Sequence, residues 1–214
     1  MEYDIEVAKR IIAPLVNTER EVEIPFVLDN MPEPPAKLLD VSCSYSTFVT
    51  EMDKLGFDSW GIDILDYGTP YDKFIKADAR KIPFAAKSFD VVTCISALEH
   101  YGLVETPYHS DIVYDPEAAP TAMEEMARVV KDDGIVILTL PFGYAEGEWL
   151  KWVKFYGWDM LKKLINSANL SVFKKQIKVL EDNIWKEISI EKGEKVLTTD
   201  KVNCNICLIL KKIC

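Results

Sequence analysis

The order of apolar and polar residues along most of this chain alternates between strand-like and helix-like patterns. Short apolar runs predict strands over residues 37–41, 60–64, 73–76, 89–95, 135–140, 170–180 and 203–211. Apolar residues at helical spacing predict helices over residues 47–55, 116–130 and 158–168. Strands that alternate with helices are typical of a doubly wound α/β fold with a mostly parallel sheet.

The segments before and after this core show other sequence patterns. Helical spacing predicts an N-terminal helix over residues 2–16, and four prolines predict an irregular loop over residues 20–35. Residues 187–199 are expected to form an extra hairpin around Lys192 and Gly193. We therefore expect a single domain in three parts: an N-terminal helix and proline-rich cap (1–35), a ligand-binding core (36–143), and a C-terminal helix with strands (144–214).

Acidic residues close the first two strands of the predicted core. Asp40 lies at the end of the first strand and Asp63 at the end of the second. Ligands of open α/β sheets bind outside the carboxyl ends of the strands, so we expect the turn after Asp40 to face a ligand. A carboxylate at Asp63 can accept hydrogen bonds from two ribose hydroxyls. The sequence therefore predicts a nucleotide-like ligand at this edge.

The turn itself reads Asp40-Val-Ser42-Cys-Ser44-Tyr-Ser46. It resembles the first motif of the class I S-adenosylmethionine-dependent methyltransferases, Asp-Val-Gly-Cys-Gly-x-Gly, with serine at all three glycine positions. Glycine accepts positive φ and lets the backbone approach a ligand closely. Serine adds only one Cβ and one hydroxyl, so we expect the cofactor to fit if the backbone keeps ordinary φ and ψ.

Two later stretches extend the resemblance. Asp78 and Ala79 follow the third strand, where family members place an acid and a small residue against adenine. Residues 82–100 resemble the Pro-Phe…Ser-Phe-Asp-x-Val…Leu-Glu-His pattern of small-molecule, type 11-like members. The resemblance implies a Rossmann-like sheet of seven strands, the last antiparallel, with helices on both faces. It implies S-adenosylmethionine as cofactor, with contacts from Asp40, Ser42, Cys43, Ser44, Asp63, Ile64, Asp78, Ala79, Ser96 and Ala97.

Two histidines are candidates for a catalytic base. The resemblance implies that residues 96–100 lie beside the reacting methyl group, and the unperturbed pKa of histidine suits His100 to proton removal. The alternative is that Glu99 and His100 only brace the loop. His109 lies in a tyrosine-rich connection over residues 101–117, which is long enough to wall an acceptor pocket. His109 is either a second catalytic candidate or loop support.

The expected reaction is methyl transfer to an oxygen or nitrogen of a small or carbohydrate-like acceptor, such as a sugar or nucleotide-sugar. Two alternatives remain open. One is a catalytically inactive descendant that keeps the fold as a binding or scaffold module, which the serine-substituted turn favours. The other is a dinucleotide-dependent oxidoreductase, which the missing Gly-x-Gly-x-x-Gly pattern disfavours.

Composition and charge limit the kinds of partner that this protein is expected to bind. The net charge is −10, and the acidic residues gather before residue 149, whereas the last 66 residues carry 13 lysines against 7 acids. An acidic chain whose last arginine is Arg128 is a poor candidate for nucleic-acid recognition. The five cysteines fit reduced thiols, and Cys204 and Cys207 fit buried strand positions better than a metal site. We expect a cytoplasmic protein with neither a membrane span nor a secretory signal.

Overall fold

The computed structural model describes residues 18–43, 46–66, 71–103, 114–145, 153–198 and 202–213. Its helices are α2 (Arg20–Asp29), α3 (Phe48–Lys54), α4 (Ala118–Val129), α5 (Trp158–Ser167) and α6 (Ile190–Gly193), with 3₁₀ turns η1 (Ala79–Lys81) and η2 (Leu98–His100). Its strands are β1 (Lys37–Val41), β2 (Asp58–Asp63), β3 (Phe74–Lys76), β4 (Phe89–Ile95), β5 (Val130–Pro141), β6 (Tyr144–Ala145), β7 (Leu170–Glu181), β8 (Ile184–Glu187), β9 (Leu197–Thr198) and β10 (Cys204–Lys212).

The main sheet among the described residues has eight strands in the order β3-β2-β1-β4-β5-β10-β7-β8. The pairs from β3 to β5 are parallel, whereas β10 runs antiparallel to both β5 and β7. The predicted mostly parallel Rossmann-like sheet with an antiparallel last strand is confirmed. The eighth strand is an addition to the seven that were expected.

The added strand β8 follows a tight turn that was not predicted from the sequence. β8 pairs antiparallel with β7 through Asp182 and Asn183, which both have positive φ, at 52° and 61°. Asparagine and aspartate tolerate this conformation, which tight hairpins favour. The hairpin predicted around Lys192 and Gly193 is wrong, because Ile190–Gly193 forms the short helix α6, which the Ser189 side chain caps.

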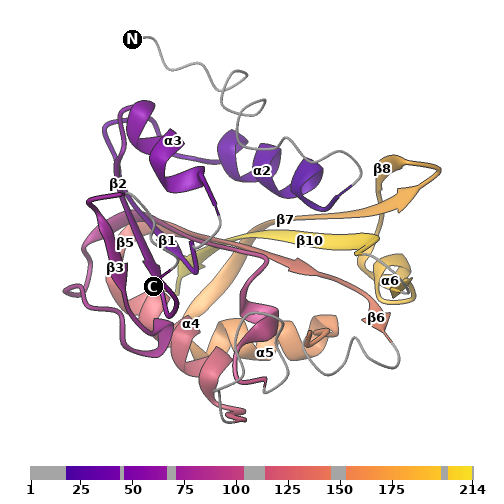
Figure 1. Ribbon diagram of the computed structural model, residues 1–214. Coiled ribbons are helices and arrows are strands. Elements are labelled where there is room, and N and C mark those ends of the chain that lie inside the picture. The colour runs from indigo at the N-terminus through magenta and orange to yellow at the C-terminus, as the bar shows by residue number, and fades with distance from the viewer. Residues whose placement is uncertain are drawn as a thin grey trace.

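Helices cover both faces of the sheet (Figure 1). On one face, α2 and α3 contribute buried side chains, including Phe26 and Phe48, to one apolar cluster. On the other face, α4 and α5 contribute Met123 and Leu161, among others, to a second and larger cluster. The strands β4 and β5 lie between the two layers, with most of their residues buried.

Residues 20–35 are not the irregular loop that their prolines suggested. α2 occupies the first ten of them and contains Pro25 within the helix. Its side chains Val22, Phe26 and Val27 are buried in the core. Burial of apolar area therefore outweighs the backbone hydrogen bond that a proline removes from a helix. The helix predicted over residues 2–16 lies outside the described residues.

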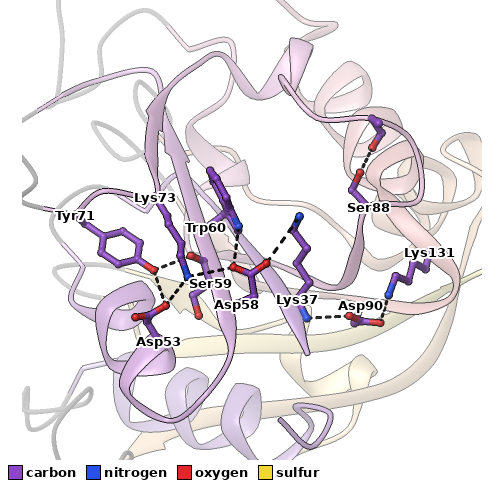
Figure 2. Close-up of polar contacts among 11 residues, drawn as sticks. Lys37, Asp53, Asp58, Ser59, Trp60, Tyr71, Lys73, Ser88, Asp90 and Lys131 are labelled. Carbon is purple, nitrogen blue, oxygen red and sulfur yellow. Dashed lines mark hydrogen bonds and ion pairs between the residues drawn. The ribbon is translucent and has the colours of Figure 1, made fainter. Parts of the chain in front are cut away.

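The amino-terminal ends of β1 and β2 carry a chain of ion pairs (Figure 2). Lys73 Nζ lies 2.8 Å from Asp53 Oδ1 and 3.1 Å from Asp58 Oδ1. Asp90 accepts a hydrogen bond from the backbone amide of Lys37. These charged groups are paired with one another, which is typical of a solvated sheet edge.

No helix within the described ranges is long and apolar enough to cross a membrane.

Candidate active site

The carboxyl ends of the parallel strands β1, β2 and β4 meet at the opposite edge of the sheet. The register pairs Val41 with Ile62 and Asp40 with Thr93, so the residues that follow each strand come together. Asp40, Asp63 and Ser96 are each at or beside one of these strand ends. The structure therefore brings together three of the predicted cofactor-binding residues.

The turn after β1 is built on a serine in a conformation that usually takes glycine. Ser42 has φ of 66°, so the condition of ordinary φ, under which the cofactor was expected to fit, is not met at the first of the three serines. The amides of Ser42 and Cys43 both donate to the carbonyl of Ile62, at 2.8 and 3.2 Å. Two hydrogen bonds thus hold a conformation that costs a non-glycine residue about 1 to 2 kcal/mol. Ser44 lies outside the described residues.

The Ser42 side chain is also engaged. Its Oγ lies 2.5 Å from the hydroxyl oxygen of Tyr101, which follows η2. Cys43 packs beside Gly61 of β2, where an added Cβ would lie 2.6 Å from the Cys43 sulfur. The turn is consequently bonded to the loop after β4 and fits closely over a glycine in the neighbouring strand.

Asp40 lies beneath this turn and is only 3% exposed. It accepts a hydrogen bond of 2.6 Å from Thr93 Oγ1 on β4. Burial raises the pKa of the Asp40 carboxyl to about 7, although the Thr93 hydrogen bond opposes this shift. A carboxyl with this pKa is partly protonated near neutrality, so Asp40 can both donate and accept hydrogen bonds.

Asp63 closes β2 and is 9% exposed. Its Oδ1 accepts a hydrogen bond of 2.9 Å from the amide of Leu65, which fixes the orientation of the carboxylate. The next residue, Ile64, is 38% exposed, which is unusual for an isoleucine. An oriented carboxylate beside an exposed apolar side chain can bind a ligand that has a polar face and an apolar one.

Asp78 pairs with Arg80, which was not among the predicted site residues. Arg80 donates to Asp78 through Nη2 at 2.6 Å and to Asp115 Oδ2 through Nη1, also at 2.6 Å. Asp78 additionally caps η1, in which Ala79 is the first residue. The predicted acid and small residue are therefore adjacent after β3, with the acid clamped by an arginine. Side-chain pairing between Arg80 and Asp115, 35 residues apart, gives no signal in the sequence.

Ser96 and Ala97 follow β4, and Ser96 has φ of 43°. The Ser96 hydroxyl donates to Glu23 of α2. Glu23 is fully buried and also accepts hydrogen bonds from Asn205 at 2.8 Å and from Arg20 at 3.0 Å. α2 is thereby anchored at the carboxyl end of β4 and at the amino-terminal end of the antiparallel strand β10. Arg20 and Glu23 were not predicted as site residues because the prolines disfavoured a helix there. Asn205 was not predicted because it meets Glu23 only in the folded chain.

Glu99 and His100 lie in the turn η2, directly after Ala97. His100 Nε2 is 3.9 Å from Glu99 Oε1, and the His100 side chain is 17% exposed. Glu99 is 2% exposed, and its Oε2 has no hydrogen-bond partner in the part of the chain that the structure describes. Burial raises the pKa of Glu99 to about 8, with the charge of Glu23 also contributing. His109 lies outside the described residues.

The segment after residue 152 lies against this turn. The amide of Lys154 donates to the carbonyl of Glu99 at 2.8 Å. Tyr156 is 2% exposed, and its hydroxyl also has no partner among the described residues. No group of three or more metal-ligating side chains occurs in the described ranges. A carboxyl group and a phenol group thus lie on two segments that a hydrogen bond joins.

Comparison with known proteins finds similarity to methyltransferases. A family model for a methyltransferase domain matches residues 39–138. A solved S-adenosylmethionine-dependent methyltransferase from Methanosarcina mazei is 16% identical, with a TM-score of 0.59 over 88% of this chain and 97% of that one. A methyltransferase from Thermotoga maritima, titled a possible histamine N-methyltransferase, is 13% identical, with a TM-score of 0.61 over 97% and 95%.

A third similar structure holds the demethylated cofactor. The 1,6-didemethyltoxoflavin-N1-methyltransferase of Burkholderia thailandensis, solved with S-adenosylhomocysteine, is 11% identical to this chain. The TM-score is 0.57, and the match covers 98% of this chain and 78% of that one. No curated protein sequence matches.

Proposed function

We propose that this chain is a class I S-adenosylmethionine-dependent methyltransferase, which its similarity to a methyltransferase family model and to solved methyltransferases supports. It would transfer the methyl group of its cofactor to an oxygen or nitrogen of a small polar acceptor. The observation that carries the proposal is the meeting of Asp40, Asp63 and Ser96 at the carboxyl ends of three parallel strands, near Glu99, whose Oε2 has no hydrogen-bond partner among the described residues. Sugars and nucleotide-sugars remain among the acceptors to be screened.

The donor groups at this edge fit S-adenosylmethionine by their chemistry. Asp63 would accept the ribose hydroxyls, because its Oδ1 is already oriented by Leu65. The backbone amide, Nε and Nη2 of Arg80 all donate to Asp78, so about one of the carboxylate's roughly four acceptor positions would be left for the adenine amino group. Ala79 would donate to the adenine ring through its backbone amide.

The remaining contacts belong to the methionine end. The turn at Ser42 and Cys43 and the loop at Ser96 and Ala97 would lie on either side of it, with Ile64 against the nucleoside. S-Adenosylmethionine supplies a methyl group that its sulfonium already activates. The protein therefore needs to align the acceptor, exclude water and remove one proton.

Cofactor binding is the first test. At a hundredfold excess over its dissociation constant, S-adenosylmethionine or S-adenosylhomocysteine should stabilise the native protein by about 2.7 kcal/mol. For a domain of this size the melting temperature should rise by roughly 5 to 10 °C, measured by differential scanning fluorimetry. No shift, together with no calorimetric heat at millimolar cofactor, would contradict the proposal and favour a scaffold that has lost its cofactor.

Ser42→Gly tests the unusual turn. We expect cofactor affinity to rise by roughly three- to tenfold, because glycine removes a Cβ from the turn and takes positive φ at no cost. The measurement is isothermal titration calorimetry with S-adenosylhomocysteine. Tyr101→Phe is the matched control, since it breaks the same hydroxyl contact but leaves the Cβ of Ser42 in place. Weaker binding by Ser42→Gly would identify the serine hydroxyl as a cofactor ligand instead.

A further inference from the structure

Two buried polar atoms beside the proposed methyl-transfer site have no hydrogen-bond partner within the described part of the chain. They are Oε2 of Glu99 and the hydroxyl of Tyr156. The backbone hydrogen bond from Lys154 to Glu99 joins the two segments that carry them, and the charge of Glu99 acts on Tyr156. Buried polar groups in native proteins nearly always have partners, so a pair of exceptions in one place requires an explanation. A bound polar ligand is such an explanation.

Glu23 shows what a structural carboxylate looks like in this protein. Like Glu99, it is buried at the end of β4, but it accepts from Ser96, Asn205 and Arg20. The fold has thus supplied one of these two neighbouring acids with three donors and has left the other with an oxygen atom unpaired. Glu99 therefore bears a cost of burial that Glu23 does not.

We propose that the Glu99 carboxyl and the Tyr156 hydroxyl bind the acceptor, that the acceptor is an amine, and that Glu99 takes its proton. This inference rests on the proposed methyltransferase function and names the acceptor class for the same site. Each of the two oxygens can accept a hydrogen bond, and an ammonium group offers three donors, whereas an alcohol offers one.

The surrounding charges favour a cation. The ionisable groups that act on Glu99 or Tyr156, or contact them, come from α2 and the residue before it, β4, η2 and the segment after residue 152; they are Glu19, Arg20, Glu23, Cys94, His100 and Lys154. With Glu99 itself, this set has three carboxyl groups and two permanent cations, Arg20 and Lys154. A phosphate or carboxylate acceptor would be repelled, whereas an ammonium would be attracted.

The proton has a defined path. Bound as an ammonium beside the ionised carboxylate, the acceptor gives one proton to Oε2 of Glu99, which leaves a lone pair on nitrogen. That pair forms the new nitrogen–carbon bond as the sulfur–carbon bond of the donor breaks, and the electrons of the broken bond stay on sulfur. Burial holds the pKa of Glu99 near 8, which suits this exchange at neutral pH.

The test measures acceptor binding without turnover. The probes are benzylamine and methylamine, with benzyl alcohol and methanol as their neutral counterparts, titrated into the protein saturated with S-adenosylhomocysteine. We expect at least one amine to bind at least tenfold more tightly than its alcohol. At pH 7 its binding should release close to one proton, seen as a dependence of the heat on the ionisation enthalpy of the buffer, because Glu99 ionises on binding.

Variants of Glu99 and Tyr156 test whether these residues cause the preference for amines. Glu99→Gln should weaken amine binding at least tenfold and abolish proton release, and Tyr156→Phe should weaken it severalfold. Glu187→Gln, at an exposed position on β8, is the control and should change neither. Circular dichroism melting curves show whether each variant is folded.

The possible outcomes separate this inference from the proposed function. If S-adenosylhomocysteine does not bind, the proposed function fails. If it binds but no amine is preferred over its alcohol, or if Glu99→Gln binds amines like the wild type, only the amine inference is overturned. Loss in His100→Asn with no loss in Glu99→Gln would also overturn it and assign the proton to the histidine.

Discussion

Asp63→Ala is expected to weaken S-adenosylhomocysteine binding by about 2 to 3 kcal/mol, or roughly 30- to 150-fold, and to leave the fold intact. The carboxylate closes β2 and is held by the amide of Leu65, so its replacement removes two charge-assisted hydrogen bonds to the ribose at once. Isothermal titration calorimetry gives the affinity. Asp63→Asn, which can still accept from Leu65, should lose part of this affinity.

The same strand offers a matched control at its other end. Asp58 opens β2 at the amino-terminal edge, where it pairs with Lys73 and Lys37 (Figure 2). Asp58→Ala should leave cofactor affinity unchanged, because it removes an aspartate from the strand end that faces away from the proposed site. Equal affinity in wild type and a well-folded Asp63→Ala variant would show that the ribose is held elsewhere.

The strands of the core could be predicted because each is a continuous apolar run. Lys37–Val41 and Phe89–Ile95 match the predicted bounds, and Leu39 and Val92, for example, are fully buried. In a parallel sheet covered on both faces, nearly every strand residue is buried, so the pattern carries the signal. The acids Asp40 and Asp63 were found for the same reason, since each interrupts or ends such a run.

α2 could not be predicted by the same reasoning. Its buried carboxylate Glu23 is satisfied by Asn205, which lies 182 residues later in the chain, and by Ser96. Those partners come together only after the sheet order is set. Proline residues are a local signal against a helix, and the burial that overrides them is a property of the whole fold.

The choice of catalytic candidates also depends on backbone conformation and on burial. A sequence does not show that Ser42 takes positive φ, or that Glu99 is 2% exposed with an unpartnered oxygen. His100 was selected from its intrinsic pKa, which is the best guide when environments are unknown. In the structure, its neighbour Glu99 has an environment that brings a carboxyl into the same pH range.

Glu99→Gln is expected to stabilise the protein near neutral pH and to change the pH dependence of its stability. The pKa of Glu99 is raised by burial from 4.5 to about 8, so the folded state holds a proton that the unfolded state has released. The penalty is absent below about pH 4.5, grows as the pH rises to 8 and is constant above that. At pH 7 it amounts to about 3 kcal/mol, and glutamine does not carry it.

Urea unfolding at pH 5 and pH 7 measures this effect. The stability difference between Glu99→Gln and wild type should grow in favour of the variant by roughly 2 kcal/mol over that interval. Glu125→Gln is a control of opposite sign, because the hydrogen bond from Arg128 lowers the pKa of Glu125 and its ionised form stabilises the fold. Parallel pH curves for Glu99→Gln and wild type would show that Glu99 is ionised in the folded protein. A variant that gains stability and loses amine binding would mark Glu99 as a residue kept for binding at the expense of the fold.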